Sequence, residues 1–366
     1  MKIIRETVIQ ETGRVAQLRG MFDIQPEKTS RVEWDVHLEL PPDWNIGAIV
    51  GPSGSGKTTI ARELFGSHLC KGFEWDASKS VIDGFPKDAG IKDVTALLSS
   101  VGFSSPPNWL RPFHVLSNGE QFRVTIARAL CEQKDLVVLD EFTSVVDRNV
   151  AKIGSAAVAK AVRERNQKLI AVSCHSDILD WLLPDWVYEP ATDSLTLARE
   201  GLRRPTIELE IHRTNYQTWQ LFRHVHYLDT NLNRSAVCFV ALWQGVPVCF
   251  SSWVSLFHGQ ILNGIREHRT VTLPDFQGVG IGNAVSAFCA SMFRALGKRV
   301  FSTTSHPAMI RSRVKSPLWR VSRGTSFTAK DSNTLRIKHA QNRLTTGFEY
   351  VGAEMDKAEA TKLYGS

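Results

Sequence analysis

Residues 51–59 read GPSGSGKTT, which fits the pattern G-x-x-x-x-G-K-[ST] at every fixed position. Glycines in this pattern let the backbone turn so that successive N–H groups face one phosphate. The lysine reaches the β- and γ-phosphate oxygens, and the hydroxyl that follows it holds Mg²⁺. The stretch therefore predicts a site for ATP and Mg²⁺. Its residues are Gly51, Ser53, Gly54, Gly56, Lys57, Thr58 and Thr59.

A second group of motifs lies further along the chain. Residues 116–121 read LSNGEQ, and the apolar run Leu136–Leu139 ends at Asp140 and Glu141. A buried strand that ends in two acids suits a metal site, in which Asp140 lies next to the metal and Glu141 polarises the attacking water. Two further elements follow, Ser144–Asp147 and, after the apolar run Leu169–Val172, His175.

This set of motifs resembles the ATP-binding cassette (ABC) ATPases. The resemblance implies an α/β fold and a signature loop at Ser117–Gln121, in which Ser117 and Gly119 contact nucleotide. It also implies a D-loop at Ser144–Asp147 and a switch histidine, His175, near the catalytic Glu141. In this family the signature loop of one subunit closes over the ATP of the other. We therefore expect a head-to-tail homodimer when ATP binds.

Two features depart from the family pattern. No Gln lies between Lys57 and Gln121. The family's glutamine that contacts membrane partners thus has no counterpart, and we expect no transport channel. The aromatic residue that stacks on adenine is also not obvious. Phe22, which lies 29 residues before Gly51, is a candidate, and a core aromatic is the alternative interpretation.

Length and composition indicate a cytoplasmic protein with two domains. With 366 residues and 43% hydrophobic residues, the chain can form two cores. It contains no uninterrupted apolar stretch of about 18 residues, so we expect no membrane span. The N-terminus lacks a secretory signal, and the six cysteines lack C-x-x-C spacing. We expect thiols in a reducing cytosol and no zinc site.

Charge is distributed unequally between the two halves. Residues 201–366 carry 21 Lys and Arg against 10 Asp and Glu, a net charge of +11, whereas residues 1–200 have a net charge of −4. A turn-rich stretch at 190–205 favours a last hairpin followed by a linker. We predict an ATPase domain over 1–200 and a second domain over 201–366, whose basic character suits a polyanionic partner.

The second domain has its own glycine motif. Residues 277–282 read QGVGIG, between a predicted strand at Thr270–Leu273 and a predicted helix at Ile281–Leu296. Glycines at such a turn let N–H groups approach a pyrophosphate, whose charge the helix N-terminus favours. The other predicted elements are a strand at Ile207–Ile211, a helix at Thr218–Leu228, a hairpin of Cys238–Trp243 and Val246–Val254, and a final strand at Gly347–Val351.

This order of elements resembles the GNAT superfamily of acetyltransferases, over roughly residues 206–352. In that family the glycine turn binds the pyrophosphate of acetyl-CoA. The resemblance implies a mixed α/β domain and an acetyl-CoA site at Gln277, Gly278, Gly280 and Gly282. A dinucleotide-binding fold is the alternative, but its N-terminal βαβ unit and its acidic residue about 20 positions further on are missing.

Several residues are candidates for acyl-transfer catalysis. The resemblance implies an acidic base on the strand before the glycine turn, where Glu267 and His268 lie; surface charge is the alternative for both. The family's usual tyrosine acid is absent, because no Tyr lies between Tyr227 and Tyr350. His226 and His306 could serve as base or orienting residue and Tyr227 as acid, whereas a solvated histidine face, with His224, is the alternative.

The segment from Arg311 to Thr345 contains nine Lys or Arg and one acid, with Trp319 and Phe327 between them. Phosphate neutralisation together with stacking aromatics is typical of a nucleic-acid surface, although a merely basic surface is the alternative. Ser305-His306-Pro307 and His226-Tyr227 are similar to the Mom-type DNA-modification branch of bacteriophage GNAT proteins, and a phage or prophage origin would fit this.

These patterns together indicate a fusion of an ABC-type ATPase with a GNAT-type acyltransferase. The favoured function is ATP-assisted transfer of an acetyl group from acetyl-CoA to a nucleic-acid base. Two other functions remain open at this point. One is acetylation of a protein or small amine under control of the ATPase. The other is a nucleic-acid clamp whose GNAT-like domain has lost its activity.

Overall fold

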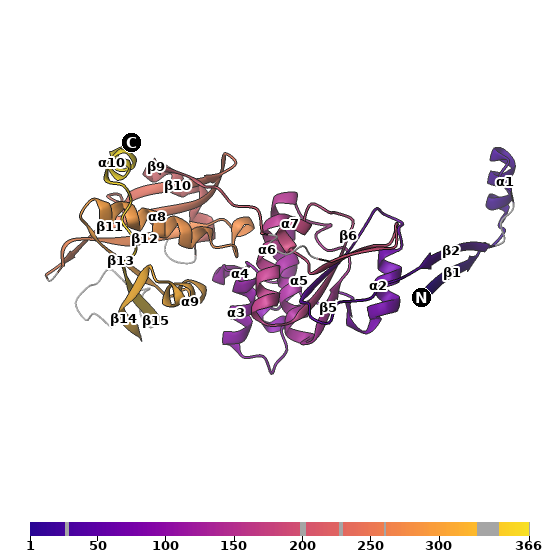
Figure 1. Cartoon of the computed structure of the whole chain (residues 1–366). Coiled ribbons are helices and arrows are strands. Elements are labelled where there is room, and N and C mark those ends of the chain that lie inside the picture. Colours follow the sequence, from indigo (N-terminus) through magenta and orange to yellow (C-terminus); the bar gives the residue numbers. More distant parts are fainter. Residues whose placement is uncertain (26–28, 198–202, 227–229, 260, 328–343, 366) are drawn as a thin grey trace. The chain divides into compact units, whose positions relative to one another are not determined.

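The computed structural model describes residues 1–25, 29–197, 203–226, 230–259, 261–327 and 344–365. The chain forms two compact units, whose elements are labelled in Figure 1. The first unit consists of Met1–Gly72, Gln133–Ser144 and Val162–Arg203, and the second of Phe73–Glu132, Val145–Ala161 and Arg204–Ser366. A domain boundary near residue 200 stays a prediction, because helical segments of the first half group with the second unit.

The first unit is built on a six-stranded sheet with the order β4-β5-β6-β3-β7-β8. All neighbouring strands are parallel except β7 and β8, which form an antiparallel hairpin. Every residue of β3 is buried, as expected for a central strand covered on both faces. The strands are β3 (Ile46–Val50), β4 (Leu69–Cys70), β5 (Leu136–Leu139), β6 (Lys168–Ser173), β7 (Trp186–Glu189) and β8 (Ser194–Leu197).

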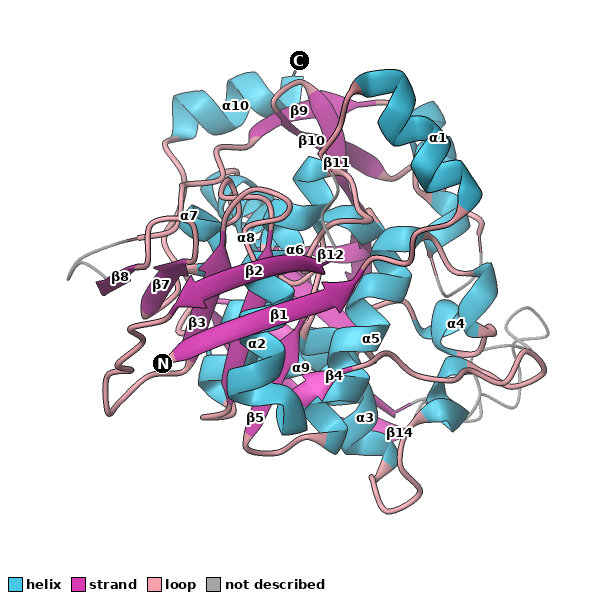
Figure 2. Ribbon diagram, turned by 90° about the vertical axis from the view of Figure 1, so that its right-hand side faces the viewer, coloured by secondary structure: helices cyan, strands magenta, loops and turns pink. Residues whose placement is uncertain are grey.

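A two-stranded ribbon precedes this sheet. Strands β1 (Lys2–Val8) and β2 (Thr29–Asp35) pair antiparallel, side by side in Figure 2. The helix between them, α1 (Gly13–Phe22), has no buried residue. The ribbon is anchored through Ile3 and Val36, which belong to the core formed by β3, β6 and helix α2 (Lys57–Phe65).

The second unit contains helices from the first half of the chain. Helix α3 packs against α5, whose buried residues include Arg123, Val124 and Leu130. The helices of this region are α3 (Ile91–Ser100), α4 (Pro106–Trp109), α5 (Asn118–Glu132) and α6 (Arg148–Glu164), with short 3-10 helices η2 (Val81–Gly84) and η3 (Phe113–Val115).

The rest of the second unit is a seven-stranded mixed sheet with the order β14-β15-β13-β12-β11-β10-β9. Only β12 and β13 are parallel, and every other neighbouring pair is antiparallel. The strands are β9 (Glu210–Thr214), β10 (Val237–Trp243), β11 (Val246–His258), β12 (Ile261–Thr272), β13 (Arg299–Thr304), β14 (Trp319–Phe327) and β15 (Leu344–Tyr350).

The two faces of this sheet are covered differently. Helix α8 (Ile281–Ala295) packs on β11, β12, β13 and β15, and α10 (Lys357–Gly365) packs on α8 and β9. The other face carries the short helices η4 (Tyr216–Leu221) and η5 (Arg223–Val225), whose Trp219 and Phe222 pack against Phe250 and Val271. Helix α9 (Pro307–Lys315) follows β13.

Most of the expected elements are confirmed, but the strand expected at Thr270–Leu273 spans Ile261–Thr272, and two other elements also differ. The predicted helix over 218–228 is wrong in its described part, because Tyr216–Leu221 and Arg223–Val225 form two 3-10 helices, with Trp219 and Phe222 buried. Aromatic and β-branched residues, which favour helices weakly, dominate it. The strand expected at 207–211 instead spans Glu210–Thr214. The turn at Gln244 and Gly245 is confirmed, with φ of 53° and 78°, as in a tight hairpin.

Two expectations from composition can be compared with the structure. Within the part of the chain that the structure describes, no helix is both long enough and apolar enough to cross a bilayer. All six cysteines are unpaired, and Cys238, Cys249 and Cys289 are buried. Apart from the exposed Cys174, the cysteines are therefore at least partly buried, as their positions in apolar runs predict.

Candidate functional site

The glycine-rich segment 51–59 connects the buried strand β3 to helix α2. Gly54 and Gly56 have φ of 84° and 91°, values that side chains with a Cβ rarely adopt. Gly56 is the N-cap of α2, so the free N–H groups of the first helical turn lie next to the loop. The Nζ of Lys57 donates to the carbonyl oxygen of Pro52, 2.8 Å away. The segment has the backbone geometry of an anion site at a helix N-terminus.

Two oxygen ligands for a divalent cation meet beside this loop. The hydroxyl of Thr58 donates to Oδ1 of Asp140, 3.1 Å away, which brings α2 next to the end of β5. The backbone N–H of Glu141 donates to the same oxygen at 2.9 Å. A hydroxyl and a carboxylate are hard oxygen donors of the kind that Mg²⁺ prefers, so these residues fit the ion.

Glu141 is exposed and has a left-handed backbone, with φ of 52°. A non-glycine residue in this conformation is strained, and such strain is common at functional positions. The next strand is connected to this turn, because Ser173 Oγ donates to the carbonyl of Phe142 at 3.0 Å and accepts from the N–H of His175 at 3.1 Å. Glu141 and His175 therefore follow two neighbouring parallel strands that one buried serine joins.

The signature loop begins helix α5 with reciprocal hydrogen bonds. The N–H of Ser117 donates to Glu120 Oε2 at 3.0 Å, and the N–H of Glu120 donates to Ser117 Oγ at 3.3 Å. This is a capping box, which fixes the Ser117 side chain at the helix N-terminus. A Cβ on Gly119 would lie 2.9 Å from Val150, so this position has little room for a side chain. Asp147 caps α6 by accepting from the N–H of Asn149.

A different aromatic residue from Phe22 lies next to the phosphate loop. Phe22 is 66% exposed, on a helix without buried residues. The indole of Trp34 instead lies against Gly56, where a Cβ would be 2.3 Å from Trp34 Nε1. An open groove of about 470 Å³ borders it, lined by Glu33, Trp34, Asp35, Ser55 and residues 190–193. The only sequence signal for Trp34 was an aromatic residue in strand β2, which pairs with β1.

We expect Trp34→Ala to weaken ATP binding about tenfold to 100-fold, because stacking of a base on an aromatic ring contributes about 1–3 kcal/mol. Phe22→Ala is the matched control and should leave the affinity unchanged. Both variants can be measured by calorimetry with a non-hydrolysable ATP analogue. Loss of affinity in Phe22→Ala, with none in Trp34→Ala, would contradict this placement of the base.

The second glycine motif lies between β12 and α8 and has the geometry of an anion site. Gly278 and Gly280 have φ of 92° and 95°, and Gly280 is the N-cap of α8. A Cβ on Gly280 would meet no atom within 4 Å, so the helix N-terminus is open there. A Cβ on Gly282 would lie 2.9 Å from Thr272 Oγ1. The turn is therefore open at Gly280, which fits a pyrophosphate at the helix N-terminus, whereas Gly278 is packed, with a Cβ there 2.7 Å from Ala157.

Gln277 holds this turn in place. Its Nε2 donates to the carbonyl of Thr272 at 2.9 Å, and its Oε1 accepts from the N–H of Ser104 at 3.0 Å, within the second unit. Its backbone carbonyl and that of Asp275 accept from the guanidinium of Arg123, at 3.2 and 2.8 Å. Burial lowers the pKa of Arg123 to about 10, although nearby carboxylates oppose this. Both the Nε2 and the Oε1 of Gln277 are thus hydrogen-bonded to backbone groups, and the side chain holds the turn through these two contacts.

Strands β12 and β13 separate as they approach the glycine turn. They pair over three residues only, from Gly264 opposite Arg299 to Arg266 opposite Phe301. Beyond this point β12 continues to Thr272 beside β11, and β13 continues to Thr304 beside β15. Two parallel strands that separate leave backbone groups unpaired on facing edges, at the carboxyl end where ligands bind in open α/β sheets.

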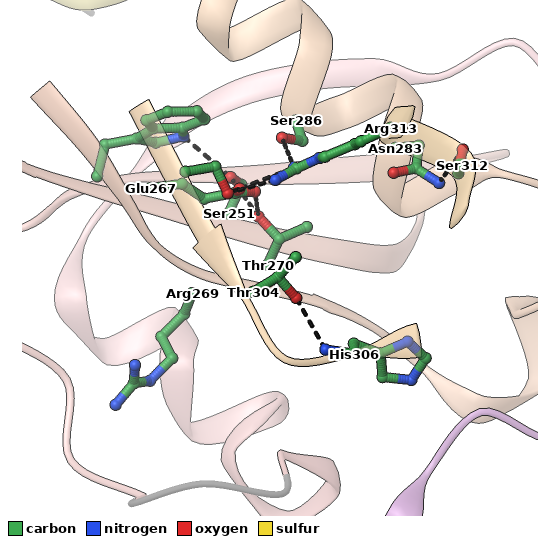
Figure 3. Close-up of polar contacts among 12 residues, drawn as sticks. Ser251, Glu267, Arg269, Thr270, Asn283, Ser286, Thr304, His306, Ser312 and Arg313 are labelled. Carbon is green, nitrogen blue, oxygen red and sulfur yellow. Dashed lines mark hydrogen bonds and ion pairs between the residues drawn. The ribbon is translucent and has the colours of Figure 1, made fainter. Parts of the chain in front are cut away.

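A buried polar cluster closes the base of this gap (Figure 3). Directly after the last backbone pair, Ser302 Oγ donates to Glu267 Oε2 at 2.5 Å. The guanidinium of Arg313, from α9, donates to the same carboxylate at 2.8 Å and to Ser286 of α8 at 2.7 Å. Thr270 donates to the other oxygen of Glu267. Side chains from β12, β13, α8 and α9 therefore replace the missing backbone pairing.

This arrangement favours a positioning role for Glu267 over that of a base. Burial alone would raise the pKa of Glu267, but the charge of Arg313 and the hydrogen bonds from Ser302 and Thr270 outweigh it and hold the pKa below its usual range. A general base works best with a pKa near the operating pH. His268, next to it, has its pKa lowered to about 4 by burial and by Arg269 and Arg266.

The histidine candidates lie in different surroundings. His224 is exposed, and the ring of His226 packs edge-on against Trp219. His306 follows β13, and its Nε2 lies 2.9 Å from the carbonyl oxygen of Ser104, which it contacts as donor. Burial lowers the pKa of His306, opposed by this hydrogen bond. Tyr227 lies outside the described residues.

The expected stacking role of Trp319 is wrong. Trp319 is 7% exposed, with its ring 4.2 Å from the guanidinium of Arg313 and edge-on to Tyr350. Its place opposite Tyr350 directs it to the core side of the sheet. Arg313, counted in the basic segment, is also buried and paired. Nothing in the structure bears on the side chain of Phe327.

The first unit and its phosphate loop define a P-loop nucleotide-binding protein. Comparisons with known proteins identify its family. Residues 79–144 match the family model of the ABC transporter. The chain is 30% identical over 174 residues to an Fe(3+) ions import ATP-binding protein of Pectobacterium atrosepticum, covering 38% of this chain and 50% of that protein. It is 30% identical over 186 residues to a lipoprotein-releasing system ATP-binding protein of Rhodopirellula baltica, covering 40% of this chain and 80% of that one.

The chain belongs to the ABC transporter family of ATP-binding proteins, through its N-terminal part. It spans about half the length of the iron-import relatives that it matches. Among solved structures, it is similar to a dimeric, post-hydrolysis ATP-binding cassette bound to ADP and phosphate, at 16% identity and a TM-score of 0.37, covering 45% of this chain and 90% of that one.

Proposed function

We propose that this protein couples an ABC-type ATPase to acetyl transfer from acetyl-CoA, with an amino group of a nucleic-acid base as the preferred acceptor. Membership of the ABC family supports the ATPase half. One observation supports the acyltransferase half. Strands β12 and β13 are parallel and separate after Arg266, and β12 leads into an open glycine turn at the N-terminus of α8. This is the element order that the GNAT resemblance implies.

In the ATPase half, Gly54 and Gly56 present backbone N–H groups to the phosphates, and Lys57 supplies positive charge. Thr58 and Asp140 would hold Mg²⁺, which neutralises charge on the phosphates when it is bound. Glu141 orients and polarises the attacking water as general base. We propose that Ser117 and Gly119 act on the nucleotide of a second copy in a head-to-tail homodimer.

In the acyltransferase half, N–H groups at Gly280 and Gly282 would hold the pyrophosphate of acetyl-CoA, and Gln277 fixes the turn. The gap between β12 and β13 would take the rest of the cofactor, whose thioester supplies the activated acetyl group. We propose that His226, as base, would take the proton from the acceptor amine and that Tyr227, as acid, would give a proton to the coenzyme A sulfur as it leaves. Glu267 positions the two strands.

We expect acetyl-CoA to bind the full-length protein, and a pair of variants at Gly280 isolates the electrostatic part of this binding. Asn and Asp both tolerate the left-handed backbone at this position and both suit a helix N-cap. Gly280→Asp adds a negative charge in front of the N–H groups. It should therefore bind acetyl-CoA about tenfold to 100-fold more weakly than Gly280→Asn, measured by calorimetry.

ATP hydrolysis without acceptor is the control and should be equal in the two Gly280 variants. No binding of acetyl-CoA to the wild-type protein would end the acyltransferase proposal. Equal affinities of the Asp and Asn variants would place the pyrophosphate elsewhere. Labelled acetyl-CoA offered with DNA, RNA or cell protein would then identify the acceptor, and label only in protein would exclude the nucleic-acid reading.

A further inference from the structure

The face of the seven-stranded sheet opposite α8 carries a row of side chains across four strands. Arg266 on β12 lies opposite Phe301 on β13, Phe301 lies opposite Glu349 on β15, and Glu349 lies opposite Arg320 on β14. Paired residues share a face, whereas their neighbours Ile265, Val300 and Phe348 are buried on the α8 side. The row therefore runs across the sheet on the side that α8 does not cover.

Further arginines extend this row, and we call the set the arginine face: Arg266, Arg269, Arg299, Arg320 and Arg323. Arg299 precedes Phe301 by two residues, and Arg323 lies opposite Gly347, two residues before Glu349, so both share the face. In Figure 3, Arg269 points away from the buried cluster of Glu267 and Arg313. Arg269 also lies on the part of β12 that leads to the glycine turn.

The arginine face keeps a strong positive charge. Glu349 is the acid in this row, and it pairs with both Arg299 and Arg320 at 2.8 Å. Burial would raise the pKa of Glu349, but hydrogen bonds and charge from the two arginines lower it, so it stays ionised. Among the residues that the structure describes, Arg266 and Arg323 form no ion pair, so the face keeps positive charge beyond what Glu349 balances. The side chains of Arg299 and Arg320 are 50% and 66% exposed.

We propose that the arginine face binds the phosphodiester backbone of a nucleic acid and leads it towards the glycine turn. Neighbouring strands are about 4.8 Å apart, so arginines on three of these four strands, β12, β13 and β14, present guanidinium groups that a polyphosphate chain can contact in succession. Arginine binds phosphate with two parallel hydrogen bonds. The arginine face is thus the surface that would hold the nucleic-acid acceptor of the proposed function. Binding of the nucleic acid does not depend on that function, whereas the acetyl transfer that follows binding does.

An anionic membrane is the competing partner, because Phe257 and Leu262, near the β11–β12 turn, are 94% and 88% exposed. The arginine face itself favours nucleic acid, since its aromatic ring, Phe301, is half-buried and lies 5.2 Å from the guanidinium of Arg299. Membrane binding needs exposed apolar area beside the charge. Among the described residues of this face, the exposed groups include the guanidinium groups of Arg266, Arg299, Arg320 and Arg323 and the hydroxyl of Thr303.

The test is the double variant Arg266→Gln/Arg323→Gln, which leaves both pairs of Glu349 intact. Lys357→Gln/Lys362→Gln, on the exposed side of α10, removes the same charge from another surface. Fluorescence anisotropy with labelled single-stranded and duplex oligonucleotides is measured on the full-length protein over a series of salt concentrations, without ATP and without acetyl-CoA. Anionic vesicles form a separate arm.

We expect the arginine variant to bind at least about tenfold more weakly and its plot of log K against log salt to be shallower by about 2, because two phosphate contacts are lost. The lysine variant should behave like the wild type. Equal losses of affinity in both variants would overturn the proposal. So would the absence of nucleic-acid binding by the wild type. A third contradicting result would be that only vesicle binding, and not nucleic-acid binding, depends on Arg266 and Arg323. If the wild-type protein binds nucleic acid but transfers no acetyl group to it, the result would instead count against the proposed reaction.

Discussion

Glu141→Gln should hydrolyse ATP about 10²–10⁴-fold more slowly than the wild-type protein, because removal of a general base costs a rate factor of this size. The amide has the shape of the carboxylate, so the left-handed turn after β5 should persist. The phosphate loop, Thr58 and Asp140 are untouched. ATP affinity should therefore remain close to that of the wild type, and ATP should accumulate in the bound state.

Phosphate release measures the rate, and size-exclusion chromatography with ATP shows whether a dimer persists in Glu141→Gln. Glu39→Gln is the control, since Glu39 is an exposed glutamate of the same unit. Unchanged turnover in Glu141→Gln would remove the assigned base. A slow variant that stays monomeric with ATP would instead count against the head-to-tail dimer.

The buried ion pair of Glu267 and Arg313 should show the largest effect on stability. Arg313→Met leaves the carboxylate of Glu267 buried without its cation, and removing one partner of a buried pair costs about 3–5 kcal/mol of unfolding free energy. Glu267→Gln should cost a similar amount. The double variant should recover much of the loss, because both charges are then absent.

Urea unfolding of the full-length variants, followed by tryptophan fluorescence, measures this coupling. Arg299→Gln breaks a half-exposed pair with Glu349 and should cost about 1 kcal/mol or less. Glu267 has a lowered pKa, so its contribution is present above the pKa of the unfolded chain and is lost as the pH falls through the folded value. Additive losses in the single and double variants would show that the pair does not hold β12 and β13.

The sequence was sufficient where function depends on local backbone geometry. Residues 51–59 and 277–282 both place glycines with positive φ directly before a helix, as their spacing predicts. Asp140 and Glu141 follow a buried strand, and Asp140 reaches Thr58, 82 residues earlier in the chain. Motifs of this kind carry their own conformation, so one sequence is enough to find them.

Contacts between distant segments could not be predicted in this way. Glu267 and Arg313 are 46 residues apart, and no pattern in either segment indicates that they pair. Glu267 therefore looked like a general base on a strand. Trp34 and Phe22 are both aromatic residues before the phosphate loop, and only the pairing of β2 with β1 shows which lies near Gly56. Trp319 looked like a surface residue because its strand is flanked by arginines.

The strand order of the second unit also determines when it can finish folding during synthesis. Strand β15 lies between β13 and β14, although it is made after both. Until residues 344–350 leave the ribosome, β13 has an unpaired edge and β14 has no neighbour in the sheet. Exposed edges of this kind promote association between chains. A premature stop before Leu344 would therefore produce an aggregating fragment, because β15 covers the edges of both β13 and β14.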